Sequence, residues 1–548
     1  MRAGVAGIVA AAVDAARKEG LIQTESLPEI ILDRPKKEDF GDFSTNIAML
    51  LAPLEKKPPR DVAKVIADKI SAHPDIEKCD VAGPGFINLF LKKTFWLGIL
   101  ENIITKGAGF GKSGAGAGKK VQVEFVSANP TGPLHIGHGR GAAVGDALSR
   151  LLEAAGFEVT KEYYINDAGR QVFTLGESIR LRAEELKGKS VEFPQDYYKG
   201  EYVREIAEAY AAKYGDGGAG APGFSVFGAA AMLERIRKDL EDFRITFDVW
   251  FSEKSLDDSG KVRDTIEALR QKGYIYEAEG ALWFRTTEFG DDKDRVLIKA
   301  DGERTYFASD IAYHLDKLER GFDSLVNIWG ADHHGYEGRI RALVRALGHD
   351  DGKLRIIFIQ LVALLRNGVP VPMGKREGEF VTLRQVMDEV GTDACRFFFL
   401  MRRPDAQLDF DLELAKSQAP ENPVYYVQYC HARIKSIIGF AAEKGIEVPE
   451  HFDAVLLSRI DSKEEAAIIK HLAAFEEIVE KSAVAMEPHR ITFYLMELAG
   501  LFHPYYNKTR VVTDDPETTG ARLLFCRAIA TVAANGLNLL GVSAPEKM

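Results

Sequence analysis

Residues 121–166 constrain the fold of this chain more than any other stretch. Val121, Val123 and Phe125 alternate with polar residues as in a strand, and apolar residues then recur at helical spacing until Gly156. A second strand-like run follows and ends near residue 166. A strand, a helix and a second strand in this order predict a βαβ unit and therefore a parallel sheet.

The turn inside this unit joins two histidines, His135 and His138, around Gly137. Glycine lets a ligand approach the backbone, N–H groups at a helix start attract phosphate, and imidazoles donate hydrogen bonds to oxygens that gain charge. We therefore expect a nucleoside triphosphate site at this turn. On this short motif alone, two structural histidines in a tight turn are the alternative.

The stretch around these histidines resembles the HIGH signature of class I aminoacyl-tRNA synthetases, in the long form typical of bacterial arginyl-tRNA synthetases. It consists of Ala128, Asn129, Pro130, Thr131, Gly132, Pro133, Leu134, His135, Ile136, Gly137 and His138. Further similarities to that family occur at residues 40–46, 82–88, 380–384, 393–400, 408–412 and 421–429, nearly end to end. The resemblance implies an arginine–tRNA ligase, which activates L-arginine with ATP and transfers it to the 3′ end of its tRNA.

The resemblance also implies roles for individual residues at the ATP site. His135 and His138 would steady the phosphate in the transition state, and Lys375 would hold the pyrophosphate leaving group. These three are the predicted catalytic residues. The predicted ATP contacts are His135, Gly137, His138, Met373, Lys375 and Arg376.

Residues 371–378 stand where the family has its second signature, a mobile Lys-Met-Ser-Lys-Ser loop. Lys375 and Arg376 supply positive charge there. Pro372 replaces the first lysine of the signature, and Gly132 stands where some family members place a compensating lysine. We expect Mg²⁺ to help neutralise the ATP phosphates. A plain surface loop with two basic residues is the alternative.

Arginine specificity requires acceptors for a planar guanidinium that is always charged, ideally carboxylates in a low-dielectric pocket. The spacings from Glu124 to Asn129 and from Tyr306 to Asp310 match those of arginine-contacting residues in similar synthetases. The resemblance implies that Glu124, Tyr306 and Asp310 bind the guanidinium end and that Asn129 binds the α-amino end. Alternatively, Glu124 is only a strand-end carboxylate and Asp310 a helix cap.

The chain has 548 residues, of which 46% are hydrophobic and 28% charged, so it is too long for one core and should form several domains. We expect an α/β multidomain fold with a Rossmann-like catalytic core, an α+β N-terminal domain and an all-α C-terminal bundle. The family resemblance implies that the N-terminal domain contacts the tRNA elbow and that the C-terminal bundle binds the anticodon. The expected boundaries are 1–106 for the N-terminal domain, 107–119 for a flexible Gly/Ala linker, 120–380 for the catalytic domain with a helical insertion at about 180–290, 381–418 for a helical stem, and 419–548 for the bundle.

Local patterns lead to more specific expectations. Residues 41–52 are predicted to be helical without a strand, residues 354–365 to form one strand, and residues 295–321 to form a strand and a helix beginning near Asp310. Ligands of parallel sheets bind at the carboxyl ends of strands. We therefore expect the polar residues that follow strands to gather there, namely Asn129, His135, Asp310, Asp332 and His333.

Aromatic and polar residues in the C-terminal helices favour contact with an RNA loop, because bases stack on aromatic rings. Among them we predict Tyr506, Asn507 and Arg510 as anticodon contacts. Aromatic residues at helical spacing are more often part of a core, which is the alternative.

Composition excludes several other classes of protein. No apolar run is long enough to cross a membrane, the start reads as an amphipathic helix, and the four cysteines form no C-x-x-C pair. We therefore expect a cytoplasmic protein without a membrane contact, a disulfide framework or a zinc ribbon. We also expect a monomer without a bound metal, although composition does not determine the oligomeric state. A net charge of −11 still permits RNA binding, because a large acidic enzyme can keep a basic track on one face. The expected partners are ATP, L-arginine and an arginine-accepting tRNA. A nucleotidyltransferase with a similar histidine turn and a non-catalytic tRNA-binding relative are the competing hypotheses.

Overall fold

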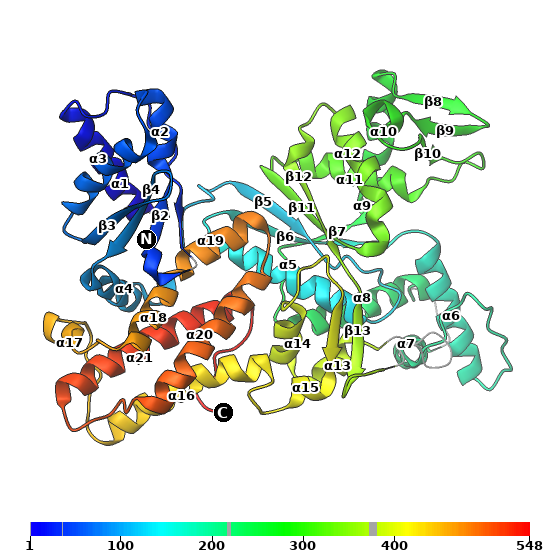
Figure 1. Cartoon of the computed structure of the whole chain (residues 1–548). Helices are drawn as coiled ribbons and strands as arrows, with labels where there is room; N and C mark the ends of the chain where they lie inside the picture. The colour runs from blue at the N-terminus through cyan, green and yellow to red at the C-terminus, as the bar shows by residue number, and fades with distance from the viewer. Residues whose placement is uncertain (1, 36, 216–220, 372–380) are drawn as a thin grey trace.

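The computed structural model describes residues 2–35, 37–215, 221–371 and 381–548. In Figure 1 an N-terminal domain lies above a helical bundle, and a central sheet lies beside both. Within these ranges the strands form one five-stranded, one four-stranded and two three-stranded sheets. The predicted combination of a parallel α/β core with an all-α C-terminal bundle is confirmed.

The N-terminal domain is built on an antiparallel sheet in the order β1-β2-β4-β3. Residues 41–52, expected to be helical without a strand, contain β2, because buried Phe43 and Thr45 alternate with Ser44 there. That expectation is therefore wrong at 43–45. The elements are α1 Arg2–Lys18, β1 Leu32–Asp33, β2 Phe43–Thr45, α2 Ile47–Glu55, α3 Pro59–Ser71, β3 Ile76–Ala82, β4 Phe86–Leu91 and α4 Lys93–Lys106.

The central sheet is parallel throughout, in the order β12-β11-β5-β6-β7. The predicted βαβ unit is present as β5, helix α5 and β6. Close packing holds α5 on the sheet, because a Cβ at Gly145 would lie 2.2 Å from Cγ of Phe125. The elements are β5 Lys120–Glu124, α5 Ile136–Ala154, β6 Glu158–Ile165, β7 Val249–Ser252, β11 Ser324–Gly330 and β12 Leu354–Ile359.

The insertion expected to be helical at about 180–290 is helical only in part. β7 completes the edge of the central sheet, and β8, β9 and β10 form an antiparallel sheet of their own. The helical expectation is wrong at β7, β8 and β9, whose short runs of aromatic and aliphatic residues suit a pleated surface. β10 lies beyond the insertion and is the strand predicted at the start of residues 295–321. The elements are α6 Arg170–Leu186, α7 Glu201–Tyr214, α8 Phe224–Asp242, α9 Glu253–Asp258, α10 Lys261–Gln271, β8 Ile275–Ala278, β9 Ala281–Phe284 and β10 Arg295–Ile298.

Two boundaries near the site differ from expectation. Helix α11 spans Tyr306–Glu319 with Thr305 as its N-cap residue, so it begins about one turn before Asp310. Residues 354–365 form two strands, β12 and β13 Val362–Arg366, because the chain turns at Gln360, whose N–H bonds to the carbonyl of Pro404. β13 pairs with β14 Val369–Pro370 and β15 Leu408–Asp411, and η4 Ala331–Tyr336 and α12 Glu337–Ala346 follow β11.

The stem expected to be helical contains α13 Leu383–Val390, α14 Thr392–Phe399 and α15 Leu412–Lys416, but β15 lies between them. The C-terminal bundle is helical as predicted. Across the described residues, no helix has the length and apolar character needed to cross a membrane. The bundle consists of α16 Pro423–Glu443, α17 Ala454–Ser458, α18 Lys463–Leu472, α19 Phe475–Ala485, α20 His489–Lys508 and α21 Pro516–Leu539.

Residues 107–119, expected to be a flexible linker, are held against the bundle. Phe110 is buried and stacks on Phe475 of α19, with ring centroids 6.1 Å apart. Asn535 of α21 donates hydrogen bonds to the carbonyls of Gly107 and Phe110 at 3.0 and 2.9 Å. These contacts, which composition does not reveal, fix the course of the segment.

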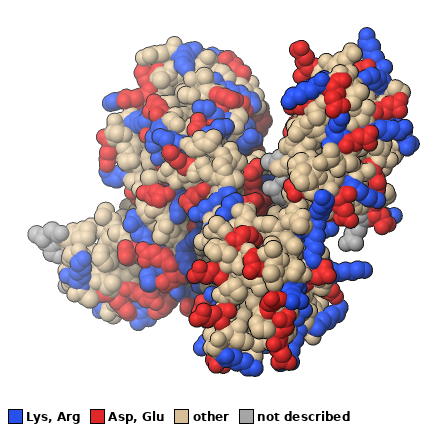
Figure 2. Space-filling view, turned by 90° about the vertical axis from the view of Figure 1, so that its left-hand side faces the viewer, with Lys and Arg blue, Asp and Glu red and all other residues tan. Residues whose placement is uncertain are grey.

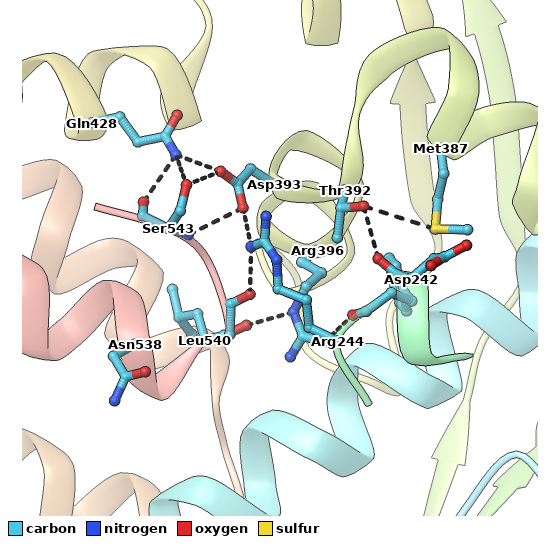
Figure 3. A network of polar contacts seen from close by, with 12 residues as sticks. Asp242, Arg244, Met387, Thr392, Asp393, Arg396, Gln428, Asn538, Leu540 and Ser543 are labelled. Carbon is cyan, nitrogen blue, oxygen red and sulfur yellow. Dashed lines mark hydrogen bonds and ion pairs between the residues drawn. The ribbon is translucent and has the colours of Figure 1, made fainter. Parts of the chain in front are cut away.

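A group of polar residues, which we call the C-terminal joint, connects α14 with residues 540–543 (Figure 3). It extends to α5 through Asp146. Buried Arg396 of α14 donates to the carbonyl of Leu540 at 2.9 Å and forms an ion pair with buried Asp146 of α5. Nearby, Asp393 accepts hydrogen bonds from Gln428 at 2.9 Å and from the backbone N–H of Ser543 at 3.0 Å. The helix that carries the two histidines is thus attached directly to the bundle.

Candidate functional site

A cavity of about 910 Å³ opens at the carboxyl ends of the central strands. The polar residues expected to gather there all line it, although they come from distant parts of the chain: Asn129, His135, Asp310, Asp332 and His333. His138 and Glu124 line it as well.

The two histidines cap the first turn of α5 and face each other. Their rings stack with centroids 3.6 Å apart. Nδ1 of His135 accepts from the N–H of His138, and Nδ1 of His138 accepts from the N–H of His135, both at 3.3 Å. Because each Nδ1 is an acceptor, the proton of each neutral ring sits on Nε2.

Burial keeps both rings neutral. It lowers the pKa of His135, although Asp332 opposes this, and together with His135 it lowers the pKa of His138 to about 3. The rings therefore act as N–H donors rather than as cations. The capping role of the Nδ1 atoms is structural, and it sets the tautomer that a phosphate oxygen requires.

Gly137 is required by this arrangement of rings. A Cβ at that position would lie 3.0 Å from Cε1 of His135, closer than a side chain ordinarily tolerates. The glycine of the turn thus preserves the stacked pair as well as the approach of a ligand.

Four carboxylates line the cavity, and three of them act on one another: Glu124, Glu253 and Asp310. The fourth, Asp332, acts on His135. Burial and the charges of Glu253 and Glu124 raise the pKa of Asp310 to about 7. Burial also raises the pKa of Glu253, although the hydroxyls of Ser309 and Tyr164 oppose this. Such a group favours a bound cation, which would relieve the repulsion between the carboxylates.

The structure separates the two alternatives considered for the acidic pair. Asp310 is not a helix cap, because α11 begins at Tyr306 and its N-cap residue is Thr305. Glu124 does end strand β5, and its carboxylate already has partners: Oε1 accepts from Ser127 at 3.0 Å, and Oε2 forms an ion pair with buried Lys317.

Asn129 and Tyr306 lie at the edge of the same cavity. Nδ2 of Asn129 donates to Oε1 of Gln171 at 2.6 Å. Tyr306 is 53% exposed at the first position of α11. Both side chains are therefore within reach of a ligand in the cavity, as the predicted contacts require.

Glu253 is the acidic residue that sequence reasoning missed. It is only 7% exposed and follows directly after β7. The signal was present: had residues 249–252 been identified as a strand, Glu253 would have stood at the carboxyl end of a parallel strand, where ligands bind.

The second signature falls outside the described residues, which end at 371 and resume at 381. Met373, Lys375 and Arg376 therefore stay predictions. Gly132 faces a second cavity of about 1240 Å³, where the Tyr202 hydroxyl donates to the carbonyl of Thr131 at 2.9 Å.

The predicted anticodon residues lie at the end of α20. Tyr506 is partly buried, stacks on Phe502 with centroids 6.0 Å apart, and has the guanidinium of Arg433 5.2 Å from its ring centroid. Asn507 and Arg510 are exposed. The face in Figure 2 mixes basic and acidic side chains without a continuous basic surface. The charge of this face alone therefore does not indicate a binding site for RNA.

Family profiles match the chain in three successive parts. Residues 5–91 match the arginyl tRNA synthetase N terminal domain, residues 100–403 the catalytic domain of tRNA synthetases class I (R), and residues 427–548 the DALR anticodon binding domain. The parallel sheet and its histidine turn are those of a class I aminoacyl-tRNA synthetase.

Relatives over the whole chain narrow this class. The chain is 55% identical over 538 residues to arginine–tRNA ligases of Citrifermentans bemidjiense and of Geobacter sp. strain M21, with 97% of both chains covered in each case. The solved structure of Thermus thermophilus arginyl-tRNA synthetase shares the fold, with a TM-score of 0.76, 23% identity and 100% of both chains covered. The chain belongs to the arginyl-tRNA synthetase family, as its signature stretch predicted.

Proposed function

We propose that the cavity carries out both steps of arginine–tRNA ligation. The arginine carboxylate attacks the α-phosphorus of ATP, the bond to pyrophosphate breaks, and arginyl-adenylate forms. A hydroxyl of the 3′-terminal ribose of tRNA then attacks the arginyl carbonyl carbon, and AMP leaves. The observation that supports this most directly is that two neutral imidazole donors and three mutually interacting carboxylates line one cavity at the strand ends.

In this proposal the carboxylates bind the arginine side chain. Asp310 and Glu253 accept the N–H groups of the guanidinium, and Tyr306 flanks it at the rim. Glu124 lies in the wall of the same pocket, where it is paired with Lys317. Asn129 binds the α-amino group and so orients the carboxylate toward ATP.

The histidine turn binds the phosphates. His135 and His138 donate hydrogen bonds to oxygens that gain charge as the phosphate is attacked, and Gly137 lets the nucleotide lie close. From the family resemblance alone, Met373, Lys375 and Arg376 contact ATP, and Lys375 holds the leaving pyrophosphate.

Mg²⁺ would accompany ATP and reduce the charge of its phosphates. The ring and backbone N–H groups of the turn fit phosphate oxygens rather than a metal. Among the described residues no group of three or more His, Cys, Asp or Glu is arranged to hold a metal ion. The phosphate oxygens of ATP would therefore supply most of the ligands of Mg²⁺.

The bundle binds the tRNA, and Tyr506, Asn507 and Arg510 are the proposed anticodon contacts. The match of residues 427–548 to an anticodon binding domain supports this placement. A monomeric state and a cytoplasmic location stay predictions.

The deciding experiment is ATP–pyrophosphate exchange with each amino acid in turn, with and without total tRNA. Exchange with arginine alone is the expected result. Exchange with a different amino acid would overturn the pocket assignment. Binding of tRNA without any exchange would favour a non-catalytic relative.

A further inference from the structure

A fully buried lysine lies behind the wall of the arginine pocket. Lys317 of α11 forms an ion pair with Glu124, and its Nζ donates to Oδ1 of Asn327 at 2.9 Å. Nζ also lies 4.3 Å from the centroid of the Tyr313 ring. Lysine is almost never fully buried without partners, because the ammonium loses its hydration. No role proposed above uses this residue.

Buried hydrogen bonds connect this lysine with Asp310. Because Oδ1 of Asn327 accepts from Lys317, its Nδ2 is directed at Nε2 of His314, 3.0 Å away. Nδ1 of His314 then donates to the backbone carbonyl of Asp310 at 2.8 Å. Burial lowers the pKa of His314 to about 3, so the ring stays neutral and keeps this direction of donation. Glu124 and Asp310 are therefore joined through the interior.

The balance of charge in the pocket depends on this lysine. Of the four carboxylates that line the cavity, Glu124, Glu253 and Asp310 act on one another where one guanidinium is to bind. The fourth, Asp332, acts on His135 instead. Carboxylates held close together in a low dielectric disfavour each other's ionisation. Lys317 offsets one of them, so that two remain for the single positive charge of the ligand.

We propose that Lys317 is a positioning residue that sets the charge of the arginine pocket: by occupying Glu124 it leaves Asp310 and Glu253 to bind the guanidinium. This inference rests on the proposed function. Lys317 acts through Glu124 and does not touch the substrate.

Other charged and titratable groups also surround the pocket, and among them only Lys317 is paired with Glu124 in the described residues. Glu162 of β6 is paired with Arg320 and accepts from the Tyr313 hydroxyl at 2.6 Å. Tyr164 faces Glu253. Arg339 of α12 and, to a smaller extent, Lys317 lower the pKa of Asp310 and so oppose the carboxylates that raise it.

The test is the pH dependence of kcat/KM for arginine in tRNA aminoacylation, from about pH 5.5 to 9, because this ratio reports groups of the free enzyme. In the wild type the ratio rises with pH as Asp310 ionises. Removing the nearby ammonium makes ionisation of Asp310 harder, so Lys317→Met moves the rise to higher pH by about one unit. Glu124→Gln removes a nearby negative charge and moves the rise to lower pH.

The double variant Glu124→Gln/Lys317→Met removes both charges. We expect it to bring the rise back to within about 0.3 pH units of the wild type. If Lys317→Met does not fold, the comparison of Glu124→Gln with the double variant still tests the proposal. The rise of kcat/KM should then lie at lower pH in Glu124→Gln than in the double variant. In every variant that folds, the KM for arginine changes and the KM for ATP does not.

Lys261→Met is the matched control. Lys261 of α10 pairs with Asp316 and Glu319 of α11, the helix that carries Lys317, and it does not line the cavity, so its loss should leave the pH profile unmoved. The inference is overturned if the rises of the two single variants coincide with the wild type, or if KM for arginine and KM for ATP change together. Absence of arginine-dependent activity in the wild type would instead overturn the proposed function itself.

Discussion

Among single residues, Asp310 is the proposed arginine contact whose ionisation the fold changes most clearly. It lies within the first turns of α11, and burial together with Glu253 and Glu124 raises its pKa to about 7. A carboxyl group binds a guanidinium well only when ionised. The raised pKa therefore places the ionisation of the arginine pocket in the neutral pH range.

We predict that Asp310→Asn raises the KM for arginine about 100-fold, since a hydrogen bond to a charged group contributes about 1.5–3 kcal/mol. The KM for ATP should change little, and the rise of kcat/KM for arginine through about pH 7 should disappear. Steady-state kinetics of both substrates over pH provide the measurement. Glu319→Gln, exposed on the same helix, is the control and should change neither constant. Equal rises in both KM values would contradict the assignment.

A substitution at Gly137 tests whether catalysis depends on the stacked rings of His135 and His138. An added methyl group would meet the His135 ring at 3.0 Å and displace it. We predict that Gly137→Ala lowers kcat about 10- to 100-fold, because small misplacements of a catalytic group have effects of that size. Gly439→Ala on α16, where nothing lies within 4 Å, should keep kcat and leave stability equal or slightly higher. Unchanged kcat in Gly137→Ala would mean that the stacked rings are not needed for catalysis.

At the scale of whole elements, the success of sequence reasoning depended on the length of the pattern. The βαβ unit and the C-terminal helices were predicted because their apolar periodicity extends over many residues. Four-residue strands such as β7 give too short a pattern, so Glu253 was missed. The start of α11 was misplaced by about one turn, and that error left the helix-cap alternative for Asp310 open.

Which side chains pair between elements was not predictable, although the gathering of polar residues at the strand ends was. Lys317 reads as one more basic residue near the end of a helix, and only the fold places it against Glu124, far away in the chain. The packing of residues 107–119 against Phe475 is likewise a tertiary contact. Periodicity reports which face of an element is buried, whereas pairing between buried polar groups depends on the whole topology.

The C-terminal joint gives a prediction at this scale. Gly541 has a φ of 65°, and a Cβ there would lie 2.2 Å from the guanidinium of buried Arg396. Gly445 has a φ of 75° with nothing within 4 Å, so it shows the cost of the backbone conformation alone. We predict that Gly445→Ala lowers the free energy of unfolding by about 1–2 kcal/mol and that Gly541→Ala lowers it by about 2–4 kcal/mol. Urea unfolding followed by circular dichroism measures both, and equal losses would mean that Arg396 moves aside freely.

At the scale of the whole molecule, an acidic protein must still bind a polyanion. The net charge is −11, and the face shown in Figure 2 has no continuous basic surface. Phosphate contacts dominate the affinity of such complexes and make it salt-dependent. Few basic side chains should therefore account for a large share of the affinity, and each should have a measurable effect.

Arg510 is the basic side chain chosen to test this effect on tRNA affinity. It is exposed, follows α20 by two residues and lies near Asn507 and Tyr506 in the chain. We predict that Arg510→Ala weakens tRNA binding about 3- to 10-fold and reduces the salt slope of log Kd by about one, while the KM for arginine stays unchanged. Lys444→Ala is the control and should keep the wild-type slope. Lys444 is exposed and directly follows the C-terminal end of α16. Filter binding at several salt concentrations gives both slopes. A reduced affinity with an unchanged slope would assign Arg510 to base stacking or to the support of Tyr506 rather than to a phosphate, and an unchanged affinity would remove it from the tRNA-binding surface.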